Sequence, residues 1–309
     1  MRHISAIPAA ACIVLMLLAS PAAAAEPPGD ANDLFPPEMV SFVPYDGNPV
    51  FSGTGADTWD RMIRERGYIL REGDAWHLWY TGYNPERSDM KFLGYATSPD
   101  GLSWTRYPGN PVFTESWVED MCVVHHGGLY YMFAEGRGDI AHMLTSADRV
   151  NWDDHGSLDI RYTDGKPLSP GPYGTPTVWI EGDTWYLFYE RNNEAVWLAA
   201  STDGKVWTNV TDDPDISPGP AAYDSEAVAL NQVIEYGDRY YAVYHACAHQ
   251  PWRDWNTSIA VSDDLVHWTK YPGNPIVAGD KSSGVYVHDG AVMRLYTMHP
   301  DVRVYFPGE

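Results

Sequence analysis

Basic residues are scarce in this chain of 309 amino acids. It has 20 lysine and arginine residues against 42 aspartate and glutamate residues, which gives a net charge of −22 at neutral pH. Binding to the phosphates of DNA or RNA requires a positively charged surface on the protein. The composition therefore argues against nucleic acid as a partner, and it suits a soluble exported protein.

Long apolar runs are almost absent. One such run, residues 9–18, follows Arg2 and His3 and precedes small residues that end at Ala25. A short apolar run between a basic start and a small-residue cleavage pattern is typical of a secretory signal peptide. The run is also shorter than a membrane span. We therefore expect residues 1–25 to be a signal peptide, with no membrane anchor and a secreted or periplasmic location.

Cysteine is scarce as well. Cys12 lies inside the expected signal peptide, which leaves Cys122 and Cys247 in the mature chain. These two residues fall in different units of the repeat described next, so we expect two buried thiols rather than a disulfide.

A repeat of β-hairpins runs through the rest of the chain. Glycines at positions 73, 127, 182, 237 and 290 recur at intervals of about 55 residues, each between a short β-prone run and an aromatic run. A strand, a tight turn that contains glycine and a second strand form a β-hairpin. A fixed period of this length is typical of repeat folds, and five β-rich units predict a ring around one axis.

A second hairpin follows the first one in four of the units. Its turn has the pattern Ser-x-Asp, and a tryptophan stands on the returning strand at positions 104, 152, 207 and 268. Asp and Gly tolerate the backbone geometry of such turns. Each unit is therefore four antiparallel strands. The predicted fold is all-β, a single five-bladed β-propeller over residues 39–309, after an N-terminal linker over residues 26–38.

The fourth strand of the last unit is expected to come from the other end of the chain. Residues 41–51 match residues 103–113 and 267–277, which contain the fourth strands of two other units, and all three segments share the pattern Gly-Asn-Pro. We therefore expect the N-terminal segment to complete the last blade. Such closure removes two open sheet edges that would otherwise promote aggregation.

Strand direction sorts the connections of each blade onto two ends of the ring. The turns after the first and third strands share one end, while the connections before the first strand and after the second share the other. Turn chemistry explains the aspartates of the first end. At the second end, carboxylates, cations and histidines converge on the axis, which favours a functional site. The candidates are Arg64, Glu65, Asp120, Glu135, Arg137, Glu190, Arg191, Asp224, Glu226, His245 and Lys281.

The repeated hairpins, the Ser-x-Asp turns and the Asn-Pro-Val strand exits resemble those of the five-bladed β-propeller glycosidases, the superfamily of glycoside hydrolase families 43, 32, 62, 117 and 130. The resemblance covers residues 39–305. It implies an axial funnel with acidic residues on the innermost strands and a carbohydrate substrate. It implies no required cofactor, although it allows an axial Ca²⁺ with His245 as a candidate ligand.

The resemblance also implies catalytic roles. By position, Glu65 or Asp60 takes the place of the general base and Asp120 that of a second carboxylate. The family 43 pattern Glu-x-Pro is replaced here by residues 174–176, Gly-Thr-Pro, so the general acid must come from a neighbouring strand, from Glu190, Glu135 or Glu226. We predict that Glu65, Asp120 and Glu190 are catalytic and that the other candidates at this end bind substrate. Because carboxylates from different blades suit a wide separation, we expect an inverting glycoside hydrolase.

Three alternatives remain open at this point. The chain could be a glycoside phosphorylase, which would use cations to hold phosphate, or a polysaccharide lyase with His245 or a tyrosine as base. It could also be a sugar-binding propeller without catalysis, since one fold hosts many functions. The cations near the funnel either neutralise its carboxylates or bind an anionic sugar substituent.

Overall fold

The computed structural model describes residues 31–308 except residues 170 and 193, and it describes only the backbone of Glu65. The expected signal peptide lies outside the described residues. The described chain starts with two short helices, η1 (Ala31–Leu34) and α1 (Pro37–Val40), and a third short helix, η2 (Ala222–Asp224), lies between strands. Almost all other regular structure is β-strand.

The strands of the described chain form five antiparallel groups, each called a meander below. One parallel pair, Tyr173 with Ile140, joins the second and third groups into a single nine-stranded sheet. The first meander is β2 (Met62–Glu72), β3 (Ala75–Tyr83), β4 (Lys91–Ser98) and β5 (Thr105–Arg106). The second is β6 (Glu119–His126), β7 (Leu129–Gly136), β8 (Ile140–Ser146) and β9 (Asp153–Ser157). The third is β11 (Tyr173–Glu181), β12 (Thr184–Arg191), β13 (Ala195–Ser201) and β14 (Val206–Asn209), with β10 (Asp159–Arg161) added parallel to β14.

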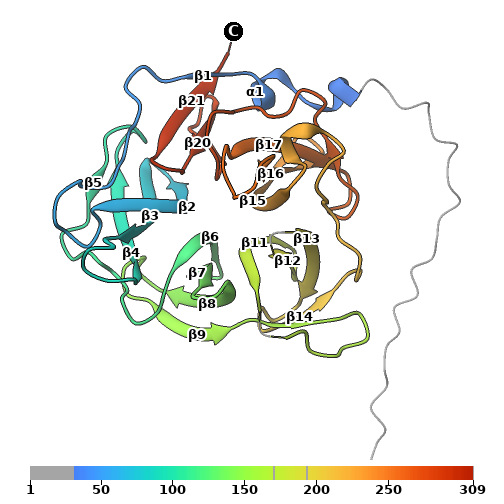
Figure 1. Ribbon diagram of the computed structural model, residues 1–309, viewed down its shortest axis with the longest axis horizontal. Helices are drawn as coiled ribbons and strands as arrows, with labels where there is room; N and C mark the ends of the chain where they lie inside the picture. The colour runs from blue at the N-terminus through green and yellow to red at the C-terminus, as the bar shows by residue number, and fades with distance from the viewer. Residues whose placement is uncertain (1–30, 170, 193, 309) are drawn as a thin grey trace, which may run out of the picture. The chain divides into compact units, whose positions relative to one another are not determined.

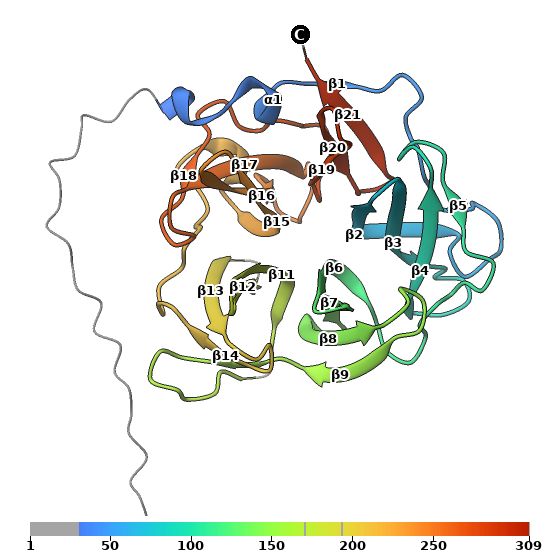
Figure 2. The same cartoon turned by 180° about the vertical axis from the view of Figure 1, so that it is seen from behind.

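The fourth meander is β15 (Ala227–Tyr236), β16 (Arg239–Cys247), β17 (Asn256–Ser262) and β18 (Thr269–Lys270). The fifth is β19 (Val285–His288), β20 (Met293–Thr297) and β21 (Arg303–Pro307), completed by β1 (Phe42–Pro44). The first strands of the meanders contact one another in a closed cycle, from β2 through β6, β11, β15 and β19 back to β2. Figures 1 and 2 show the meanders arranged around one axis. The fold is all-β and consistent with a propeller.

The N-terminal segment completes the fifth meander, which confirms the predicted pairing. Strand β1 runs antiparallel to β21, with Phe42 opposite Pro307, and Phe51 forms a further bridge to Val302. Residues 31–38, for which we expect a linker, lie in η1, α1 and the turn between them. Phe35 is buried there, and its ring centre lies 4.9 Å from that of Tyr271. The segment before β2 therefore adds both hydrogen bonds and apolar packing.

Removal of residues 26–52 should destabilise the whole domain. The deletion exposes the edge of β21 and takes Phe35, Met39 and Phe51 out of the core. Loss of three such side chains costs several kcal/mol, about 2–5 each by analogy with truncation in a core. Thermal unfolding should therefore start far below that of the intact protein. Val43→Ala, at an exposed position of β1, is the control that should change little, and an unchanged melting temperature after the deletion would contradict closure.

The Gly-Asn-Pro pattern has a clear structural role. In the first meander, the side chain of Asn110 accepts a hydrogen bond from the backbone N–H of Tyr95 at 2.9 Å and donates one to its carbonyl, also at 2.9 Å. Asn274 makes the same two bonds to Ile259 in the fourth meander, and Asn48 does so in the fifth. An asparagine amide thus continues the pairing of the sheet where the fourth strand turns away.

The cysteines are free and buried, as predicted. Cys122 lies on β6 and Cys247 at the end of β16. Within the described residues, no helix is long and apolar enough to cross a membrane.

Candidate active site

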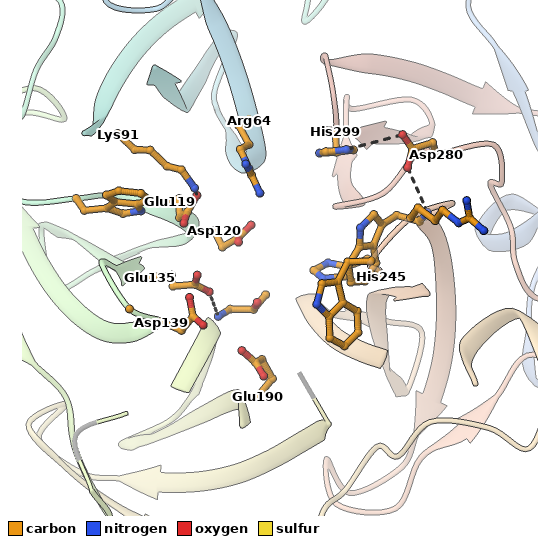
Figure 3. Close-up of a pocket in the computed structure, with 16 residues that line it drawn as sticks. Arg64, Lys91, Glu119, Asp120, Glu135, Asp139, Glu190, His245, Asp280 and His299 are labelled. Atoms are coloured by element: carbon orange, nitrogen blue, oxygen red, sulfur yellow. Dashed lines mark hydrogen bonds and ion pairs between the residues drawn. The ribbon is translucent and has the colours of Figure 1, made fainter. Parts of the chain in front are cut away.

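A cavity of about 550 Å³ lies at the end of the meanders where the first strands begin and the second strands end. This is the end at which the sequence predicts the site. Figure 3 shows carboxylates of the second and third meanders on one side, and His245, Asp280 and His299 on the other. The lining residues are Arg64, Lys91, Trp117, Glu119, Asp120, Glu135, Gly138, Asp139, Thr175, Glu190, His245, Trp252, Arg253, Trp255, Asp280 and His299.

Irregularities in the innermost strands aim side chains into this cavity. The pairing register shifts between Glu119 and Cys122 on β6, and between Gly174 and Thr177 on β11. Within these shifts, Asp120 and Thr175 each adopt a φ of 46°. Positive φ is unusual for such residues, and bulges of this kind re-aim side chains beside active sites. The two residues with this strained backbone, Asp120 and Thr175, both line the cavity.

The buried Arg66 closes the axis beneath the cavity. Its guanidinium donates hydrogen bonds to the carbonyl oxygens of Asp120 and Pro176, and to the carbonyl oxygens of Leu230 and Asn231 at 3.0 Å each. It therefore joins β2 to β6, β11 and β15. A separate cavity lies on the other side of Arg66. It is lined by residues that follow along β2, β6, β11 and β15, such as Tyr68. Arg66 and the strands that it joins therefore separate the two cavities.

Glu135, at the end of β7, is a strongly perturbed carboxyl group of the cavity. Its residue exposure is only 8%, and its Oε2 accepts a hydrogen bond from the backbone N–H of Thr175 at 3.1 Å. Burial raises its pKa well above the usual value, and the neighbouring carboxylates of Asp120, Glu119 and Asp139 raise it further. A carboxyl in these surroundings keeps its proton where an exposed glutamate loses it.

Gly174 makes room for two carboxylates. A Cβ atom at this position would lie closer than 3.0 Å to Oε1 of Glu190 and also to Oε2 of Glu135. The two carboxylates therefore face each other across the glycine. In the family 43 pattern the chain carries a glutamate here, whereas in this chain glutamates of the flanking strand β12 and of β7 fill the space.

Gly174→Ala should therefore impair activity far more than stability. The added methyl group must push Glu190 and Glu135 apart, and misplacement by about 1 Å can cost on the order of a hundredfold in rate. The measurement is kcat/KM beside the melting temperature, with Gly55→Ala as control because nothing lies within 4 Å of its added Cβ, although its φ of +66° adds some backbone strain. Wild-type activity of Gly174→Ala would show that the two carboxylates do not act together.

One wall of the cavity contains a buried ion pair. Lys91 at the start of β4 bonds to Glu119, and its ammonium group lies 4.5 Å from the ring centre of Trp117. Both charged residues are less than a tenth exposed. Because Lys91 is already paired, this wall offers little unused positive charge to a ligand.

The opposite wall is built around His245. Its Nδ1 accepts a hydrogen bond from the Asn231 amide at 2.8 Å, and its ring meets the edge of Trp255. Burial lowers the pKa of His245 to about 4, so the ring is neutral at physiological pH. Among the described residues, no three His, Cys, Asp or Glu side chains are placed to hold a metal ion. The surroundings of His245 do not fit the axial Ca²⁺ that the resemblance allows, and we derive no step through a metal.

The structure brings together some of the predicted site residues. Asp120, Glu190, Arg64, Glu135 and His245 all line the cavity. The predicted catalytic residue Glu65 lies on β2, but its side chain is outside the described part of the structure.

The other predicted substrate-binding residues do not line the cavity. Arg137 pairs with Asp89, and Arg191 bonds to the hydroxyl of Tyr189 and lies over the ring of Trp197. Arg137 follows β7 and turns toward the connection between β3 and β4, while Arg191 ends β12 and packs within the third meander. The remaining three are Asp224, which is buried against Lys270, the exposed Glu226, and Lys281, which bonds to the carbonyl of Asp280.

Asp60, the alternative for the base position, is also absent from the lining, because its carboxylate binds Arg106 and the Tyr80 hydroxyl. Conversely, Lys91, Asp139 and the tryptophans at 252 and 255 are not predicted from the sequence. A visible signal for the tryptophans is the pattern Trp-Arg-Asp-Trp in the connection after β16, because tryptophan is on average a highly buried residue.

Comparisons with known proteins agree with this architecture. No protein-family model matches the sequence. A 1,2-β-oligomannan phosphorylase of Thermoanaerobacter sp. (strain X514) is 25% identical over 226 residues, which cover 67% of this chain and 72% of that protein. A glycosyl hydrolase structure from Bacteroides ovatus aligns with a TM-score of 0.70 at 17% identity, covering 86% of this chain and 92% of its own.

A β-1,2-mannobiose phosphorylase from Listeria innocua, solved with β-1,2-mannobiose, aligns with a TM-score of 0.64 at 15% identity and covers 86% of this chain and 95% of its own. The chain thus shares the fold of known glycosidases and sugar phosphorylases. The resemblance to the glycosidase superfamily predicted from the sequence is confirmed at that level.

Proposed function

We propose that this protein is an exported five-bladed β-propeller glycoside hydrolase that acts on the ends of neutral oligosaccharides. The observation that carries the proposal is Glu135, which is buried beside further carboxylates in the cavity, so that its pKa is raised. Glycoside hydrolysis needs a carboxylic acid that protonates the leaving oxygen and a carboxylate that activates water. Glu135 has the surroundings of the acid.

The other groups take complementary roles in this proposal. Burial and the carboxylates of Asp120, Glu119 and Asp139 keep the pKa of Glu135 high, and Glu190, across Gly174, orients the sugar. Asp120 is held by the backbone N–H of Arg66 at 2.8 Å and serves as the carboxylate that activates water. A water activated in this way attacks the anomeric carbon directly, so we propose inversion, which NMR of the first anomer formed can test.

The closed floor supports action on chain ends. Because Arg66 and its partners separate the two cavities, a polysaccharide cannot pass through the ring, and in this proposal the terminal sugar enters first. The names of the relatives make β-1,2-linked mannosides the first substrates to test.

A phosphorylase is the second candidate, because the curated relative is one. The charge of the cavity favours hydrolysis over phosphorolysis. Six carboxylates line it against the cations Arg64, Lys91 and Arg253, and Lys91 is bound to Glu119. A phosphate dianion would meet a negative field there. A lyase is disfavoured because His245, with a pKa of about 4, is a weak base.

The test is an assay with β-1,2-mannobiose and longer oligomers, beside other manno- and gluco-oligosaccharides, in buffer without phosphate. The proposal predicts release of the free terminal sugar. Release that depends on added phosphate supports the phosphorylase, whereas binding without any turnover supports a sugar-binding protein.

A further inference from the structure

The connection between β16 and β17 places two stacked tryptophans at the rim of the cavity. Trp252 and Trp255 stack with their ring centres 6.2 Å apart and their planes 17° from parallel. Both line the cavity, and Trp252 is 42% exposed. We call these two residues the tryptophan shelf. A large apolar ring that is open at a pocket rim, and not packed into a core, is characteristic of a binding surface.

The shelf is held in place by its own surroundings. His249 and Arg253 form an antiparallel bridge, and the thiol of Cys247 lies 3.0 and 3.1 Å from their carbonyl oxygens. The backbone N–H of Trp255 donates to Asp280 at 3.2 Å. A binding surface that is already ordered loses little entropy when a ligand arrives.

The position of the shelf determines which part of a bound sugar chain it can contact. It adjoins His245, which Figure 3 shows across the cavity from Glu135, Asp120 and Glu190. The floor beneath these residues is closed by Arg66. A terminal sugar at the closed end therefore directs the remainder of its chain outward, toward the open rim where the shelf lies.

We propose that the tryptophan shelf binds the pyranose ring on the leaving-group side of the cleaved bond. The apolar face of the sugar packs on the Trp252 ring, and the exposed Arg253 guanidinium donates hydrogen bonds to its hydroxyl groups. Arg253 suits this role because its ion pair with Asp254 is long, at 4.0 Å. This inference rests on the proposed action on sugars, and it identifies the part of the site that selects for a second sugar unit.

The test compares Trp252→Ala and Trp252→Phe with the wild type on β-1,2-mannobiose and mannotriose. We expect Trp252→Ala to raise KM about tenfold, which corresponds to about 1.4 kcal/mol of binding, with little change in kcat. The Phe variant should recover most of the affinity, because a ring remains. Inhibition by free mannose, which occupies the closed end, should stay the same in all variants. Tyr107→Ala is the matched control, since Tyr107 is 40% exposed and lies outside the cavity.

A binding experiment separates this inference from the proposed reaction. In Glu135→Gln, which is expected to be inactive, calorimetry with mannobiose should show the same loss of affinity when Trp252→Ala is added. If no glycan is cleaved but this loss is seen, the shelf is supported and the reaction is wrong. If cleavage is seen and Trp252→Ala leaves KM and affinity unchanged for both oligomers, the shelf proposal is overturned.

Discussion

Glu135→Gln should reduce kcat by about a thousandfold, because general acid catalysis typically contributes 10²–10⁴ in rate. Gln keeps the shape of the side chain and can still accept the hydrogen bond from the N–H of Thr175, but it has no acidic proton to give. The loss should be largest on natural oligosaccharides and smaller on a glycoside with an activated leaving group. Glu115→Gln, at an exposed position, is the control.

The same substitution should stabilise the fold at high pH. Burial and nearby carboxylates raise the pKa of Glu135 above its ordinary value of 4.5, so the folded protein holds this proton more tightly than the unfolded chain. The stability linked to that proton is present below about pH 4.5 and is lost as the pH rises through the folded-state pKa. Melting temperatures of the two proteins should therefore match near pH 4 and diverge toward pH 8, with Glu135→Gln higher. A lower melting temperature at every pH would contradict the assignment.

Arg66→Met should be the most destabilising single substitution at the site. It removes the donors for the carbonyl oxygens of Asp120, Pro176, Leu230 and Asn231, all in the closed centre of the meanders. The Leu230 oxygen still accepts a hydrogen bond from the Thr177 hydroxyl, so three acceptors lose their partner. Each such acceptor costs about 1–3 kcal/mol, so we expect a loss of at least about 3 kcal/mol in the free energy of unfolding.

Urea unfolding measures this loss. Arg239→Met is the matched control, because Arg239 forms an exposed pair with Asp263, and such pairs contribute about 0–1 kcal/mol. Arg66→Lys should fall between, since an ammonium group has fewer donors and a shorter reach than the guanidinium fork. Unfolding of Arg66→Met within about 1 kcal/mol of the wild type would show that Arg66 does not join the innermost strands.

The repeat made most of the fold predictable from the sequence. Regularly spaced glycines and Ser-x-Asp turns locate hairpins because turn geometry is a local property of a few residues. The pairing of β1 with β21 could be predicted as well. Residues 41–51 repeat a pattern that contains the fourth strand of two other meanders, so they are expected to supply the fourth strand of the last one.

The inner wall of the cavity was only partly predictable. Strand direction correctly assigned Glu135, Glu190 and His245 to one end, but it does not tell which side chains turn toward the axis. Arg191 follows Glu190 directly, yet it turns outward because it packs over Trp197. Such a choice depends on contacts between strands and on bulges, such as the one between Gly174 and Thr177, which the spacing of residues does not reveal.

The source of the oxygen atom in the released sugar tests the central proposal most directly. Cleavage of β-1,2-mannobiose in ¹⁸O-labelled water, without phosphate, should place one labelled oxygen at the newly formed anomeric carbon for each bond broken. This label should require Glu135, whereas Glu115→Gln should leave it unchanged. Release of a sugar phosphate without label, and only when phosphate is present, would contradict hydrolysis and identify the protein as a phosphorylase.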